Sequence, residues 1–100
     1  LEMYMKTALG EAEGGSTIGA VLIQRGAIVG RGHNRVNQTG NPTTHAEMEA
    51  IRDAGVLEDY TDTELYTTMM PCRMCAGAII HFGIRTVVIG NSQVVNRTVE

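Results

Sequence analysis

The sequence predicts a single α/β layered domain in which helices cover a sheet of short buried strands. Its length of 100 residues is enough for one small hydrophobic core. Segments with apolar residues at helical spacing alternate with short apolar runs bounded by glycine, as helices and strands do in a layered domain. Two of the later strands are separated by one helix, which indicates a right-handed crossover between parallel neighbours.

Residues 1–13 are predicted to form a first helix, because apolar residues recur at helical spacing until Gly14 and Gly15 end the pattern. A β-hairpin is expected next. Its strands are the apolar runs 18–23 and 27–29, which are joined by a short turn at an Arg-Gly pair. Continuous apolar runs of this kind predict strands that are buried on both faces.

The segment 34–44 is predicted to be a loop that passes over the end of the sheet, because it holds Asn, Gly and Pro at close intervals. Residues 45–54 are predicted to form the second helix. Thr44 is the expected N-cap of this helix and Gly55 its end.

A strand is predicted over 63–68 and another over 86–89, with a third helix over 71–82 between them that Gly83 closes. The second and third helices both begin after segments that leave the sheet. In such folds, the ends of the strands and the beginnings of the helices form the crevice that binds ligands. A functional site is therefore expected where these two helices start.

Composition and charge narrow the classes of partner. The chain is 43% hydrophobic and 19% charged, and no apolar run approaches the roughly 20 residues that a membrane span needs, so we expect a cytoplasmic protein without membrane contact. A net charge of −3 makes a nucleic-acid partner unlikely and favours a small molecule, because binding to a phosphate backbone normally needs clustered Lys and Arg.

Two short motifs predict a metal site. Cys72 and Cys75 are three positions apart at a predicted helix start, where Pro71 already has a helical φ, so both sulfurs can face one point. His45 opens the preceding helix and adds a nitrogen ligand, which gives a set that suits Zn²⁺. Three protein ligands leave the fourth tetrahedral position for water, and Glu47 is the expected carrier of protons beside it.

The sequence also allows two interpretations of these motifs other than a catalytic zinc site. Glu47 could be the fourth ligand of a closed structural zinc site, which would leave no position for water. The two cysteines could instead be a redox pair, although such a pair leaves His45 and Glu47 without a role. Glu49 shares the helix with Glu47 but points elsewhere at this spacing, and we expect it to be solvated.

Three segments resemble the cytidine-deaminase superfamily, and within it the fungal-type cytosine deaminases. They are Gly-Arg-Gly-His-Asn at 30–34, His-Ala-Glu at 45–47, and Leu-Tyr-Thr-Thr at 65–68, which runs into Pro-Cys-Arg-Met-Cys at 71–75. The resemblance implies a three-layer α/β/α cytidine-deaminase-like fold with a mixed sheet. It also implies a homodimer with one catalytic Zn²⁺ per subunit, which hydrolyses cytosine to uracil and ammonia.

The same resemblance suggests which residues contact the base. It implies that the Asn34 side chain and the Ala46 backbone N–H bind the carbonyl edge, and that Ile18 and Val95 form walls of the pocket. Met70 stands before Pro71, where relatives carry Ser or Glu, and it is a further candidate contact.

Alternative functions stay open on the sequence alone. Guanine, isocytosine or adenosine in tRNA could be deaminated by the same zinc chemistry, and a non-catalytic zinc module that acts through dimerisation belongs to a different class. The deaminase domain is expected to fill residues 1–100 and to be incomplete at both ends. The family's final strand and C-terminal helices, which close over the base, are expected to be missing.

Overall fold

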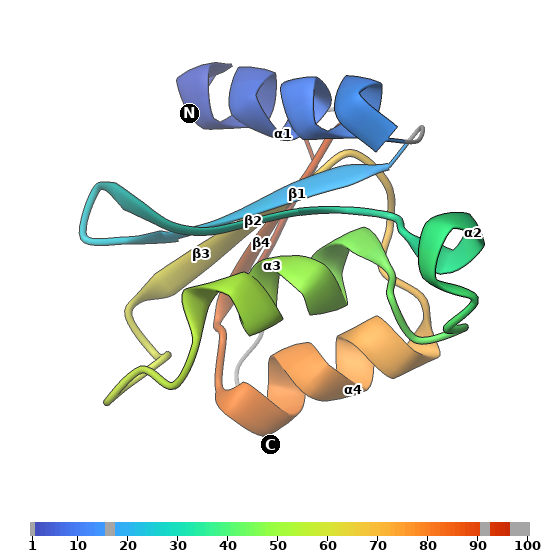
Figure 1. Cartoon of the computed structure of the whole chain (residues 1–100). Coiled ribbons are helices and arrows are strands. Elements are labelled where there is room, and N and C mark those ends of the chain that lie inside the picture. The colour runs from blue at the N-terminus through green and yellow to red at the C-terminus, as the bar shows by residue number, and fades with distance from the viewer. Residues whose placement is uncertain (1, 16–17, 91–92, 97–100) are drawn as a thin grey trace.

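A computed structural model describes residues 2–15, 18–90 and 93–96. The described helices and strands alternate in the order that the sequence predicts, with two additions (Figure 1). The helices are α1 (Glu2–Gly15), α2 (Val36–Thr39), α3 (Ala46–Ala54) and α4 (Arg73–Phe82). The strands are β1 (Gly19–Gln24), β2 (Ala27–His33), β3 (Thr63–Thr67), β4 (Thr86–Ile89) and β5 (Gln93–Asn96).

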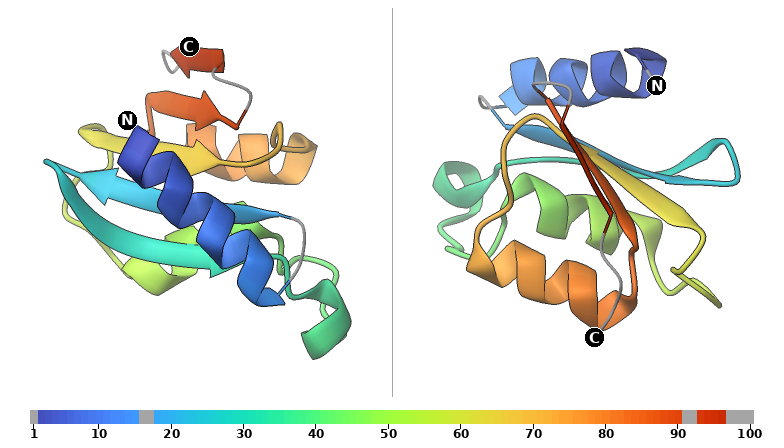
Figure 2. Two further views of the ribbon diagram at one scale, coloured as in Figure 1. Left: turned by 90° about the horizontal axis from the view of Figure 1, so that it is seen from above. Right: turned by 180° about the vertical axis from the view of Figure 1, so that it is seen from behind.

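The strands form one mixed sheet in the order β2-β1-β3-β4-β5. β1 pairs antiparallel with both β2 and β3, while β3 and β4 are parallel and are joined through α4. The predicted crossover between parallel neighbours is therefore confirmed. α1 covers one face of the sheet, and α3 and α4 lie side by side on the other, which gives the expected three layers (Figures 1 and 2).

Alternation along the strands divides the core into two clusters, one for each face of the sheet. In β1, Ala20 and Leu22 face α3 and α4, whereas Val21 and Ile23 face α1. β1 is buried on both faces, as predicted, because helices cover it from both sides. β2 is only partly buried, because it is the edge strand of the sheet.

Two glycines of β2 allow α3 to lie directly on the strand. A Cβ atom at Gly32 would lie 2.5 Å from the Ala46 carbonyl oxygen and 2.5 Å from the Ala50 nitrogen. A Cβ at Gly30 would collide with the Ala50 carbonyl oxygen. The absence of both side chains therefore fixes how closely the helix approaches the sheet.

Several predicted boundaries differ from the structure. β2 does not stop at residue 29 but continues to His33, because its glycines serve the helix contact and do not form a turn. The predicted loop 34–44 contains the one-turn helix α2. The sequence patterns do not predict β5, which follows β4 and pairs with it antiparallel. Among the described helices, none has the length and apolar character that a membrane span requires.

We predict that Gly32→Ala destabilises the fold by about 1 to 3 kcal/mol, because the added methyl must push α3 away from β2. Gly77→Ala is the matched control. Nothing lies within 4 Å of a Cβ at Gly77, and this exposed position in α4 should gain up to about 1 kcal/mol from higher helix propensity. Urea unfolding of the two variants measures the difference. Equal stabilities would contradict the close contact.

Candidate zinc site and its surroundings

The starts of α3 and α4 bring the three predicted metal ligands together. His45 is the N-cap of α3, Cys72 is the N-cap of α4, and Cys75 lies in the first turn of α4. His45 and Cys72 both have extended backbone conformations, so each ligand stands just outside its helix. The predicted helix starts at His45 and Pro71 are thus one and two residues early.

The distances between the three ligand atoms fit one tetrahedral zinc ion. The Cys72 and Cys75 sulfurs are 3.7 Å apart, and the His45 Nδ1 lies 3.5 Å from the first sulfur and 3.6 Å from the second. Typical zinc bond lengths give tetrahedral edges of about 3.8 Å between two sulfurs and about 3.6 Å between sulfur and nitrogen. The donor set and its spacing therefore suit zinc without rearrangement.

The two sulfurs have different surroundings. Cys75 is buried, and burial raises the pKa of its thiol, with a further contribution from the negative charge of Glu47. Cys72 is exposed, and the backbone N–H of Cys75 lowers the pKa of its thiol by stabilising the thiolate. A bound cation would favour the thiolate form of both. Of the two sulfur ligands, Cys72 is therefore the one that solvent reaches.

Glu47 lies beside this cluster without belonging to it. Among the described residues, the group that could hold a metal consists of His45, Cys72 and Cys75. The Glu47 side chain is buried, and this burial raises the pKa of its carboxyl, opposed by its own backbone N–H and by the charge of His45. A buried carboxyl therefore lies next to the three candidate ligands and outside their group.

The main chain brings two candidate base contacts to the same end of the sheet. The Asn34 N–H donates to the Ile18 carbonyl at 3.2 Å, and the Arg35 N–H donates to the Thr44 carbonyl at 2.8 Å, directly before His45. The Asn34 Oδ1 also accepts the Val36 N–H at 2.9 Å. The Asn34 side chain therefore closes a short turn that leads into α2, a structural role that Asn often has at such positions.

The other candidate base contacts differ in how far they are buried and in how much of each the structure describes. Ala46 is buried at the first position of α3, between the predicted ligand His45 and Glu47. Met70 is 55% exposed in the segment that leads into α4. The backbone of Val95 pairs with Val87, but its side chain lies outside the described part of the chain.

Two expectations about α3 are wrong. Thr44 is not the N-cap, because its hydroxyl donates to the Asn41 carbonyl instead and His45 takes the cap position. Glu49 is not solvated but buried, with 7% of its surface exposed. Its carboxylate forms ion pairs with Arg52 at 3.0 Å and with Arg35 at 3.8 Å.

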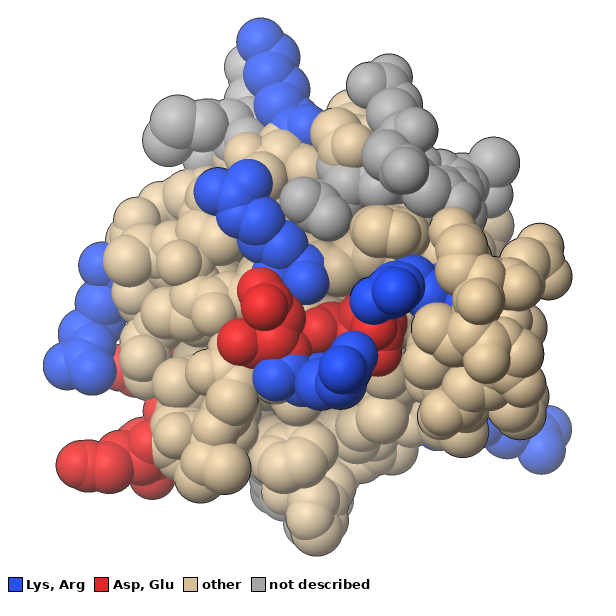
Figure 3. Space-filling view, in the orientation of Figure 1, with Lys and Arg blue, Asp and Glu red and all other residues tan. Residues whose placement is uncertain are grey.

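A polar hollow of about 420 Å³ lies between β2 and α3, away from the metal ligands. Arginine side chains surround two acidic side chains on this face of the molecule (Figure 3). The lining residues are Arg31, Gly32, His33, Arg35, Glu49, Arg52 and Asp53. No motif in the sequence predicts this cluster, although the spacing of Glu49 and Arg52 on one helix is a signal for an ion pair.

Comparison with known proteins places the chain in a family. Residues 1–91 match the cytidine and deoxycytidylate deaminase zinc-binding region. The chain is 40% identical over 84 residues to a cytosine deaminase of Candida albicans, an alignment that covers 81% of this chain and 56% of the relative. It is 41% identical over 97 residues to a tRNA-specific adenosine deaminase of Buchnera aphidicola, with 89% and 64% covered.

A solved structure of a guanine deaminase from Bacillus subtilis superposes with a TM-score of 0.80 at 39% identity, covering 88% of this chain and 62% of that one. The chain thus spans less than two thirds of the length of each of these three relatives. Their names refer to different bases, so the similarity does not single out the cytosine branch. The match over residues 1–91, together with the tetrahedral ligand set, shows that the chain belongs to the cytidine and deoxycytidylate deaminase zinc-binding family.

Proposed function

We propose that the chain carries the active site of an enzyme that hydrolyses the amino group of a nucleobase, with cytosine as the substrate. The observation that carries this proposal is a set of three tetrahedral zinc ligands with a buried carboxyl, Glu47, beside it and outside the ligand group. A closed structural site would need Glu47 as the fourth ligand. Three ligands leave a position for water, which hydrolysis requires.

His45, Cys72 and Cys75 would hold the ion. When bound, zinc would lower the pKa of a water molecule toward neutrality, which would make hydroxide available for attack on the amino-bearing carbon. Glu47 accepts the proton that the water loses. It then delivers this proton to the ring nitrogen, takes the second proton from the hydroxyl group added to the carbon, and passes that proton to the departing amino group, so that water and the amine yield a carbonyl and ammonia.

Cytosine is favoured by charge and by Asn34. The net charge of −3 does not favour a polynucleotide. The hydrogen bond from Val36 occupies the Asn34 Oδ1, so the Nδ2 donors are the part of the amide suited to the carbonyl of the base. Ala46 offers a backbone N–H at the start of α3, and Ile18, Met70 and Val95 are the proposed apolar contacts. A homodimer is part of the same proposal.

Adenosine in tRNA is the second candidate substrate. It is supported by the Buchnera relative, which is named for that activity and is as similar to this chain as the Candida cytosine deaminase. The zinc ligands and Glu47 would have the same roles in both reactions. The two candidates differ in what surrounds the base, so only a comparison of substrates separates them.

Glu47→Gln is expected to keep zinc and the fold while deamination falls about 100-fold or more, because the amide preserves shape but cannot carry protons. Glu58→Gln, at an exposed position in the loop before β3, is the matched control and should leave both unchanged. The measurements are ammonia release and zinc content per chain. If Glu47→Gln lost zinc in proportion to activity, Glu47 would be a ligand and the site a structural one.

We expect the highest kcat/KM for cytosine, with cytidine at least about tenfold poorer, because a ribose on N1 adds bulk that a site for the free base does not accommodate. The comparison includes guanine and a tRNA anticodon stem-loop that carries adenosine. A higher kcat/KM for the stem-loop would assign the chain to tRNA deamination. A higher value for guanine would likewise reject cytosine, and neither result would change the role of zinc.

A further inference from the structure

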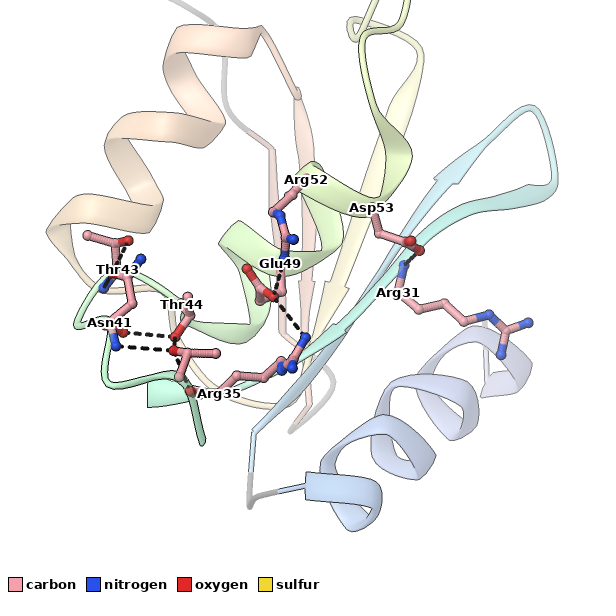
Figure 4. A network of polar contacts seen from close by, with 9 residues as sticks. Arg31, Arg35, Asn41, Thr43, Thr44, Glu49, Arg52 and Asp53 are labelled. Carbon is pink, nitrogen blue, oxygen red and sulfur yellow. Dashed lines mark hydrogen bonds and ion pairs between the residues drawn. The ribbon is translucent and has the colours of Figure 1, made fainter. Parts of the chain in front are cut away.

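The buried carboxylate of Glu49 connects α3 to the segment that follows β2. Arg52 reaches it from the next turn of the same helix, and Arg35 reaches it from the segment between β2 and α2 (Figure 4). Only the second of these ion pairs joins two different parts of the chain. The side chain of Glu49 is 8% exposed, so solvent screens this pair less than a pair on the surface.

A second carboxylate on α3 contacts β2 itself. Asp53 lies four residues after Glu49, one helical turn along the same face, and its Oδ2 accepts the backbone N–H of Arg31 at 2.9 Å. The two contacts lie on either side of Gly32, where α3 touches the backbone of β2. The end of β2 and the segment after it are thus held against α3 at three successive points.

The segment held in this way carries Asn34. Its neighbour Arg35 makes both the ion pair with Glu49 and the backbone bond to Thr44, directly before His45. We propose that Glu49, acting through Arg35, is a positioning residue that fixes the Asn34 amide relative to His45 and Glu47. This inference rests on the proposed function, because it assigns Asn34 to the base.

The structure also indicates how the effect of the Arg35–Glu49 ion pair on the segment that carries Asn34 can be separated from its effect on the stability of the fold. Loss of the Arg35 guanidinium leaves Glu49 paired with Arg52, so no buried charge is left without a partner. Arg35 itself is 43% exposed. Arg35→Gln should therefore loosen the segment without unfolding the chain.

The test compares Arg35→Gln with Arg52→Gln in the zinc-loaded protein. Arg35→Gln is expected to raise KM for cytosine about fivefold while kcat changes less than about twofold, which is the effect of losing one partly buried ion pair on binding. Arg52→Gln removes the shorter ion pair, but this pair lies within α3 and joins no other part of the chain to it. It should therefore change KM less than about twofold. Arg35→Lys, which keeps the charge, should restore most of the affinity. Equal effects of the two Gln variants on KM would overturn the inference.

Amide hydrogen exchange gives a readout that does not depend on turnover. Arg35→Gln is expected to speed exchange about fivefold at residues 34–36 and to leave α3 unchanged, whereas Arg52→Gln leaves residues 34–36 as protected as before. Unchanged exchange at 34–36 in Arg35→Gln would overturn the inference, as would faster exchange with an unchanged KM. If the unaltered protein does not deaminate cytosine, the proposed substrate is wrong, and exchange decides the positioning role alone.

Discussion

The close contact between α3 and the backbone of β2 determines where the chemistry of this protein can take place. Gly30 and Gly32 remove the side chains that would otherwise separate the helix from the strand. Because α3 lies directly on β2, its N-terminus reaches the ends of the central strands, where α4 also begins (Figure 1). His45 then meets Cys72 and Cys75, although the histidine and the cysteines are far apart in the sequence.

The first turn of α3 carries two buried carboxylates with different surroundings. Glu47 lies next to His45 and Cys75, and the cost of burying its charge raises the pKa of its carboxyl. Glu49 lies two positions further on and faces away from Glu47, toward Arg35 and Arg52. One carboxyl thus lies beside the metal ligands, where we propose that it exchanges protons, while the other is held by two cations. The positions of charged partners, not the residue type, separate the two roles.

Local sequence signals predicted the parts of the fold that depend on neighbours in the chain. The α4 helix follows from its apolar spacing and ends at Gly83, whose φ of 84° places it in the left-handed region expected of a helix end. The three metal ligands follow from residue type and spacing. The parallel strands β3 and β4 also lie within segments that the sequence predicts as strands.

The parts that could not be predicted depend on contacts between distant segments. From the sequence, Gly30 and Gly32 indicate the end of a strand, because the sequence does not show that α3 packs against their backbone. Glu49 reads as solvated, because its partner Arg35 is brought to it only by the fold. β5 is short and has no periodic pattern of apolar residues, so it is recognised as a strand only by its pairing with β4. Each of these failures concerns tertiary contact and not local propensity.

The account depends most on a zinc ion with three protein ligands and one position for water. Zinc K-edge X-ray absorption of the purified protein measures this coordination directly. We expect two sulfurs at about 2.3 Å and two lighter atoms at about 2.0 to 2.1 Å, and the same shell in Glu47→Gln, since one light atom is the His45 nitrogen and the other is water. Absence of zinc from the reduced protein, or a first shell that changes in Glu47→Gln, would contradict the account.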